Sequence, residues 1–142
     1  MLRSFSIALA VALGGAAIAN GIYMLVAPEN WYLAVPGVTT TGPFNQHFVR
    51  DIGLVFLLIG AAVLLGAVRA NVRVVSWAAA TIWLAGHALF HVWEVAVGIC
   101  GPSVLVRDFF AVTMPAALGI ALTVWAIADA RAASGHPEGR MS

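Results

Sequence analysis

Residues 44–70 read FNQHFVRDIGLVFLLIGAAVLLGAVRA and decide the fold of this 142-residue chain. Between Asp51 and Arg69 the stretch carries no charged side chain, and a helix needs only about 20 apolar residues to cross a bilayer. Three further stretches meet the same criterion, so we expect membrane-spanning helices at about residues 4–27, 44–70, 72–98 and 107–130. The expected fold class is all-α, a four-transmembrane-helix bundle with up-down-up-down topology over residues 1–133.

The composition of the whole chain agrees with a lipid environment. Hydrophobic residues make up 62% of the sequence and charged residues 9%, and the mean hydropathy is +0.97, whereas a soluble domain carries about 25% charge. A net charge of +1 excludes the basic surface of a nucleic-acid binder, and a single cysteine, Cys100, excludes an intramolecular disulfide framework. The expected partners are the lipid bilayer and further copies of the chain or a larger membrane complex.

The start of the chain resembles a cleavable signal peptide, because Met1-Leu2-Arg3 precedes an apolar run containing Ala17-Ile18-Ala19. The apolar run continues to Val26, which makes it longer than the usual core of about 7–15 residues. We therefore expect a retained first helix.

Arginine residues orient the bundle. All seven cations are Arg. If the helices alternate in direction, only Arg50 and Arg107 fall at one end, each followed by Asp, and five fall at the other: Arg3, Arg69, Arg73, Arg131 and Arg140. Because positive residues collect on the cytoplasmic side, we expect both termini in the cytoplasm, residues 134–142 as a disordered cytoplasmic tail, and a multi-pass protein of the cell (inner) membrane.

Small residues and a proline mark the packing of the first and fourth spans. Gly14, Gly15 and Ala19 supply a surface on which another helix can approach closely. Pro115 lies inside the fourth span and predicts a kink there.

The first loop is long for a connection between adjacent helices, for which 2–8 residues is usual. It carries the aromatic residues Trp31, Tyr32 and Phe44. Two interpretations stay open, a lid over an outward-facing pocket or an aromatic anchor at the membrane interface.

Titratable side chains gather near the outer ends of the second and third spans. His47 and Asp51 are spaced i, i+4, and His87, His91 and Glu94 are spaced i, i+4, i+7, so each group shares one helix face. An ionised side chain facing lipid costs at least ~2.5 kcal/mol on insertion scales. We therefore expect both groups to point into the bundle and face each other in a pocket open to the outside.

Further polar residues surround this predicted pocket. Arg50, Arg107 and Asp108 lie at the same end and are expected to balance its charge. Asn20 and Tyr23 on the first span are additional donors at a similar depth.

Imidazoles and carboxylates on facing helices are typical of metal sites, so a divalent transition metal is the first cofactor to consider. Haem b, held between His47 and either His91 or His87, is the second. Acid–base chemistry on a lipid-soluble substrate is a third interpretation. A proton or ion pathway is disfavoured because the inner half of each span is almost free of polar residues.

A structural interpretation stands beside these. Arg50 with Glu94 and Asp51 with Arg107 are two ion pairs that would hold the helices together, with the histidines hydrogen-bonded around them. The chain would then be a non-catalytic structural or accessory membrane subunit.

The start of the second span resembles one known group. Arg50-Asp51-Ile52-Gly53, followed by an apolar run that ends at Gly60, is similar to the pattern of the small four-helix bacterial membrane proteins of the DoxX-like group. The resemblance covers about a dozen residues. It implies a four-helix membrane protein, and some members of that group are tied to quinone-linked sulfur oxidation. It assigns no catalytic residue here.

Overall fold

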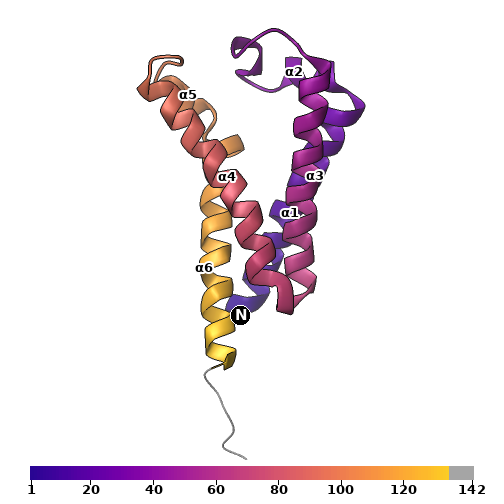
Figure 1. The fold of residues 1–142 in the computed structure, drawn as a ribbon, viewed down its shortest axis with the longest axis vertical. Coiled ribbons are helices and arrows are strands. Elements are labelled where there is room, and N and C mark those ends of the chain that lie inside the picture. Colours follow the sequence, from indigo (N-terminus) through magenta and orange to yellow (C-terminus); the bar gives the residue numbers. More distant parts are fainter. Residues whose placement is uncertain (135–142) are drawn as a thin grey trace, which may run out of the picture.

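The computed structural model describes residues 1–134, which are helical with short connections and form no strand. Four long helices dominate this range (Figure 1). They are α1 (Leu2–Val26), α3 (Gln46–Val68), α4 (Arg73–Ala96) and α6 (Met114–Ser134). With their flanking turns, all four are long and apolar enough to cross a membrane, and they overlap the four predicted segments. The predicted tail beyond Ser134 lies outside the described residues.

Short elements connect the long helices. The first connection contains α2 (Pro28–Ala34) and the 3₁₀ turn η1 (Val38–Thr40), and the second is the 3₁₀ turn η2 (Ala70–Val72). The third contains α5 (Ser103–Arg107) and the π-helical turn η3 (Phe109–Thr113). The N-terminus and the end of α6 lie toward the same end of the molecule, as alternating helices require (Figure 1).

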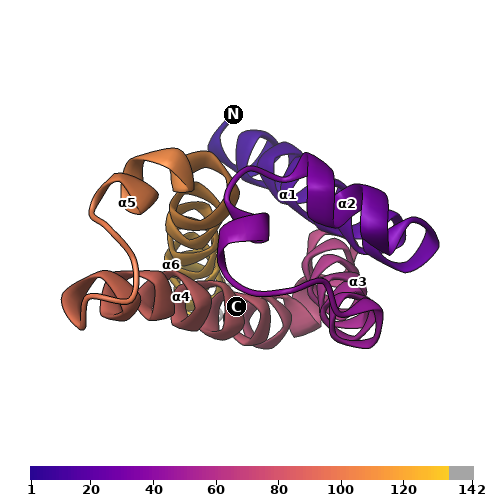
Figure 2. The same ribbon diagram turned by 90° about the horizontal axis from the view of Figure 1, so that it is seen from above.

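The long helices form two antiparallel pairs, α1 with α3 and α4 with α6. The pairs meet near the η2 turn, and from there α3 and α4 diverge toward the end that carries α2 and α5 (Figure 1). We call the end with η2 the narrow end and the end with α2 and α5 the wide end. Seen from above, the connection between α2 and α3 curves over the middle of the molecule, between the two pairs (Figure 2).

Glycines allow the close approach of α1 and α3. A Cβ on Gly60 would lie 2.7 Å from the backbone oxygen of Gly14, and a Cβ on Gly21 would lie 2.7 Å from the backbone oxygen of Gly53. The prediction of a close-packing surface is thus confirmed for Gly14. A Cβ on Gly15 would have nothing within 4 Å.

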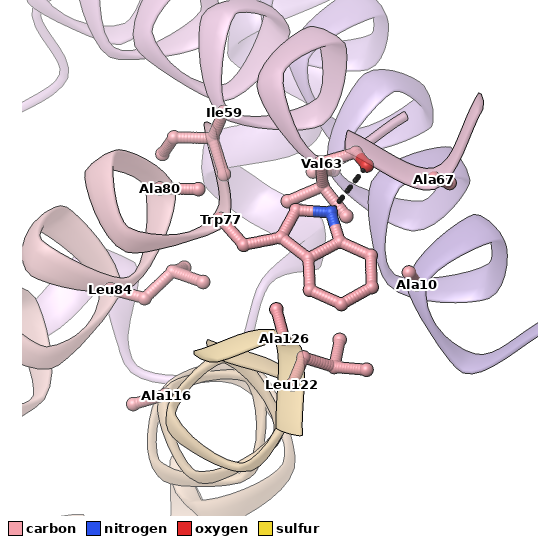
Figure 3. Close-up of a cluster of buried hydrophobic side chains, with 11 residues drawn as sticks. Ala10, Ile59, Val63, Ala67, Trp77, Ala80, Leu84, Ala116, Leu122 and Ala126 are labelled. Atoms are coloured by element: carbon pink, nitrogen blue, oxygen red, sulfur yellow. Dashed lines mark hydrogen bonds between the residues drawn. The ribbon is translucent and has the colours of Figure 1, made fainter. Parts of the chain in front are cut away.

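Trp77 fills the centre of the core near the narrow end. Its side chain is almost fully buried, and its indole Nε1 donates a hydrogen bond of 2.8 Å to the backbone oxygen of Val63 on α3. Ala10 of α1 and Leu122 and Ala126 of α6 surround the ring, so one side chain contacts the region where all four long helices meet (Figure 3).

Arg73, at the start of α4, closes the narrow end. Its guanidinium donates to the backbone oxygens of Gly66 (2.8 Å) and Ala67 (3.4 Å) and lies 3.6 Å from the carboxylate of Asp129 on α6. The last carbonyls of a helix have no partner within the helix. Arg73 therefore caps α3 and links it to α4 and α6.

Pro115 is the second residue of α6, and the π-helical turn ends two residues before it. Because proline has no N–H, the carbonyl four residues earlier loses its α-helical partner. In the preceding turn, the backbone N–H groups of Ala111 and Val112 both donate to the backbone oxygen of Asp108. A π-helical turn thus lies just before Pro115 and follows Asp108, and the kink expected at Pro115 stays a prediction.

Candidate functional site

Three ring side chains line one face of α4 toward the wide end. Trp83, His87 and His91 are four residues apart, a spacing that keeps side chains on one helix face. The His87 ring stacks on Trp83 at a centroid distance of 5.1 Å, and the His91 ring meets His87 edge-on at 4.8 Å. The prediction that His87 and His91 share a face is confirmed. Trp83 was missed, although its spacing from His87 was visible in the sequence.

Asp108 extends this row from α4 to the third connection. Its carboxylate lies 3.5 Å from Nδ1 of His91, and both side chains are largely buried, with 18% exposure for His91 and 12% for Asp108. The Nδ1 atom itself is buried and has no hydrogen-bond partner among residues 1–134. The contact is therefore close enough for an ion pair with a protonated imidazole but lacks hydrogen-bond geometry.

Arg107 binds Asp108 from the other side. Its Nε and one terminal nitrogen donate to the two carboxylate oxygens at 2.7 and 3.0 Å. This hydrogen bonding raises the pKa of Arg107, so the guanidinium stays charged. Asp108 thus lies between His91 and Arg107, and a charge-balancing role for Arg107 and Asp108 stays a prediction.

The first connection reaches the same place through Gly37. Gly37 has a φ of 87°, which favours glycine, and a Cβ there would overlap with the guanidinium of Arg107. Arg107 thus lies against the backbone of the long first loop. We use the term wide-end cluster for His87, His91, Arg107 and Asp108, together with Gly37, which packs on it.

His47 and Asp51 do not join the wide-end cluster. They pair with each other at 3.3 Å near the start of α3, and their side chains are 88% and 57% exposed. The ends of α3 and α4 that carry His47 and His91 diverge (Figure 1). The expectation that His47 and Asp51 face the His87 group across one pocket is therefore wrong, because α3 and α4 diverge at the ends that carry these residues.

The other predicted site residues have separate partners or none. Arg50 donates to the backbone oxygen of Leu25 at 3.1 Å and so caps α1. Glu94 is half-buried, and its side chain forms no ion pair within residues 1–134. The expected pairs of Arg50 with Glu94 and of Asp51 with Arg107 are therefore not formed in this part of the chain.

The two additional donors on α1 also lie outside the wide-end cluster. Asn20 accepts a hydrogen bond of 2.9 Å from the indole of Trp31, which holds α2 against α1. The side chain of Tyr23 is 40% exposed.

The hydroxyl of Tyr32 donates to the backbone oxygen of Gly42, which closes the first loop on itself.

The described residues do not favour the metal or haem set expected from the sequence. Within residues 1–134, no three His, Cys, Asp or Glu side chains are placed to hold one metal ion. Haem ligation between helices needs a second imidazole opposite His87 or His91, and His47 is directed elsewhere. What the cluster offers chemically is an imidazole pair, one of them beside a carboxylate whose charge is already matched by Arg107.

No family model, curated protein or solved structure matches this chain.

Proposed function

We propose that this chain is a multi-pass membrane protein that binds a small ligand through the imidazoles of His87 and His91. The observation that carries the proposal is the buried Nδ1 of His91, which has no hydrogen-bond partner in the described part of the chain. Buried polar atoms nearly always have a partner, and an exception calls for a bound group to supply one. A ligand at the wide end supplies that partner.

The chemistry that fits this site best is acid–base chemistry on a lipid-soluble ligand. His87, His91 and Asp108 form a row of titratable groups from the interior of α4 to the third connection, and Arg107 neutralises the carboxylate at the end of this row. Histidine changes charge near neutral pH, which suits this role. A divalent metal or haem b stays the alternative cofactor, because His87 and His91 are ligand types for both.

The structural or accessory function has its own support. Arg107 holds Asp108 through two hydrogen bonds and lies on Gly37, so the cluster connects α4, α5 and the first loop even when no ligand is bound. In this alternative the imidazoles complete the packing and bind nothing.

Thermal unfolding of the detergent-solubilised protein with Zn²⁺, haemin or octanoate separates these functions. Ligand binding predicts that at least one probe raises the Tm of the wild type, that His47→Ala leaves this shift unchanged, and that His91→Ala abolishes it. Absence of a shift with all three probes, or the same shift in His91→Ala, contradicts the proposal. In the structural alternative, Asp108→Asn lowers the Tm of the unliganded protein more than His91→Ala, because it deprives Arg107 of its partner.

The membrane assignment is part of the same proposal. The distribution of Arg supports placing the narrow end in the cytoplasm and the wide end outside, in a cell (inner) membrane. The resemblance to the DoxX-like group remains a prediction. Gly53 and Gly60, which belong to the resembling stretch, pack against α1 and contribute to the fold.

A further inference from the structure

An apolar groove runs between α3 and α4. It has a volume of about 300 Å³, which is at the lower end of the ~300–1,000 Å³ range of small-molecule sites. All of its lining residues are apolar: Val55, Leu58, Ile59 and Ala62 on α3, and Ala79, Ala80 and Trp83 on α4. The groove lies within two membrane-spanning segments, so its occupant comes from the lipid phase.

Trp83 connects this groove to the wide-end cluster. Its ring lines the groove, meets Phe56 of α3 edge-on at 5.4 Å and stacks on His87 at 5.1 Å. Along α4, His87 follows Ala80 by seven residues, which is about 10 Å at 1.5 Å per residue. An alkyl chain in the groove therefore extends along α4 to a head group at His87.

The charges of the wide-end cluster select the kind of head group. The carboxylate of Asp108 is matched by Arg107 through two hydrogen bonds and contacts His91 at 3.5 Å. His87 has no carboxylate within ion-pair distance in residues 1–134. Because Arg107 and Asp108 neutralise each other, a head group that brings its own proton, such as a carboxylic acid, binds the two imidazoles without adding net charge.

Building on the proposed function, we propose that the ligand is a single-chain carboxylic acid. Its alkyl chain lies in the α3–α4 groove, and its carboxylate binds His87 and His91. Trp83 packs between the two parts of the ligand and is therefore the natural reporter of its binding.

Trp fluorescence of the full chain in phosphatidylcholine nanodiscs tests this inference. The probe is a fatty acid brominated near the middle of its chain, compared with the matching brominated fatty alcohol, because bromine quenches indole at short range. We expect saturable quenching by the acid, loss of the saturable part in Trp83→Phe, and half-saturation by the alcohol at about tenfold higher mole fraction. Equal, non-saturable quenching by the acid and the alcohol means bulk lipid only and overturns the inference.

Two variants with controls separate the chain site from the head-group site. Ala62→Phe fills the groove and should abolish saturable quenching, whereas Ala61→Phe, on the exposed neighbouring position of α3, should leave it unchanged. His87→Phe keeps a ring on Trp83 but removes the nitrogens, so it should retain weak binding and lose the preference for the acid. Retention of that preference in His87→Phe, or of saturation in Ala62→Phe, contradicts the inference.

The outcomes also distinguish this inference from the proposed function. If Zn²⁺ or haemin raises the Tm through His91 while the brominated acid shows no saturation, the fatty-acid inference fails and the proposed function stands. If neither effect occurs, both fail.

Discussion

At the scale of single residues, Arg73 links three of the four long helices. Its side chain is almost completely buried, and its guanidinium also lies 5.6 Å from the ring centroids of Trp77 and Trp125. The sequence identified Arg73 only as a marker of orientation. Its burial was not predictable, because only the fold brings the end of α3, the start of α4 and Asp129 together.

Replacing Arg73 with Ala should lower the free energy of unfolding by about 2–3 kcal/mol, because hydrogen bonds from a charged donor to two buried carbonyls are lost. Arg69→Ala is the matched control, since Arg69 lies at the same turn but is exposed, and its effect should stay within about 0.5 kcal/mol. Unfolding in mixed micelles with increasing dodecyl sulfate measures both. Equal effects of the two substitutions would contradict the role of Arg73.

Gly37 gives a second prediction at this scale. Gly37→Ala should destabilise the protein more than Gly98→Ala, although both residues have positive φ, 87° and 78°. The shared left-handed conformation costs roughly 1–2 kcal/mol for a residue with a Cβ. Only at Gly37 does the new Cβ also collide with Arg107, whereas at Gly98 nothing lies within 4 Å. Limited proteolysis of the first loop should show faster cleavage in Gly37→Ala alone, and equal cleavage would disprove the contact.

Part of the candidate site could be predicted from single residues and their spacing. The shared face of His87 and His91 followed from their spacing, because the geometry of one helix is independent of its neighbours. The position of Asp108 next to His91 did not follow, since it depends on the π-helical turn before Pro115. The predicted association of His47 with these residues was wrong for a related reason. Contacts between helices depend on where the helix ends diverge, and the spacing of residues within one helix does not reveal this.

At the scale of elements, the contact between α1 and α3 has a regular basis. Gly14 and Gly21 on α1 are seven residues apart, as are Gly53 and Gly60 on α3, and in the antiparallel pair Gly14 meets Gly60 while Gly21 meets Gly53. Small residues at such positions let backbones approach closely in membranes, where packing largely replaces the hydrophobic effect. The sequence analysis predicted such a surface only on α1. The matching glycines on α3 could be identified only after the structure had shown that α1 pairs with α3.

Gly60→Ala should therefore destabilise the protein by about 1–3 kcal/mol through overpacking. Gly15→Ala should be neutral or stabilising by up to about 1 kcal/mol, because its Cβ meets no other atom and alanine favours helix. Reversible unfolding in mixed micelles compares them directly. A larger loss of unfolding free energy in Gly15→Ala than in Gly60→Ala would contradict the stabilising role of the α1–α3 contact.

The bounds of the long helices were predictable because the thickness of the bilayer fixes their length. The short elements were not, since α2, α5 and the π-helical turn span five to seven residues each and have no distinct hydrophobic period. These short elements carry Arg107 and lead to Asp108 and Gly37. The unpredicted elements therefore position much of the candidate site.

At the scale of the whole molecule, the arginines divide between the two ends. Arg69 and Arg73 flank η2 at the narrow end, whereas Arg50 and Arg107 lie toward the wide end near α2 and α5. The angle between the two helix pairs is the largest feature that sequence reasoning did not anticipate, because all four spans are apolar on nearly every side and do not encode which faces separate.

The orientation can be tested with the native cysteine. Cys100 lies in the third connection at the wide end, so a membrane-impermeant maleimide should label it in intact cells. In the Cys100→Ser background, Ser134→Cys at the end of α6 should be labelled only after the membrane is permeabilised. Labelling in the reverse order would place the wide end in the cytoplasm and contradict the proposed orientation.

The pairing of α1 with α3 and of α4 with α6 also bears on how the chain is assembled. In each pair the partners are consecutive spans, so every close helix–helix interface within a pair joins segments that leave the ribosome one after the other. The first hairpin contains all four interface glycines and can close before α4 has been synthesised. The second hairpin then docks through Trp77, Arg73 and further contacts such as that of Trp83 with Phe56, and the eight residues from Gly66 to Arg73 form the junction between the two successive halves.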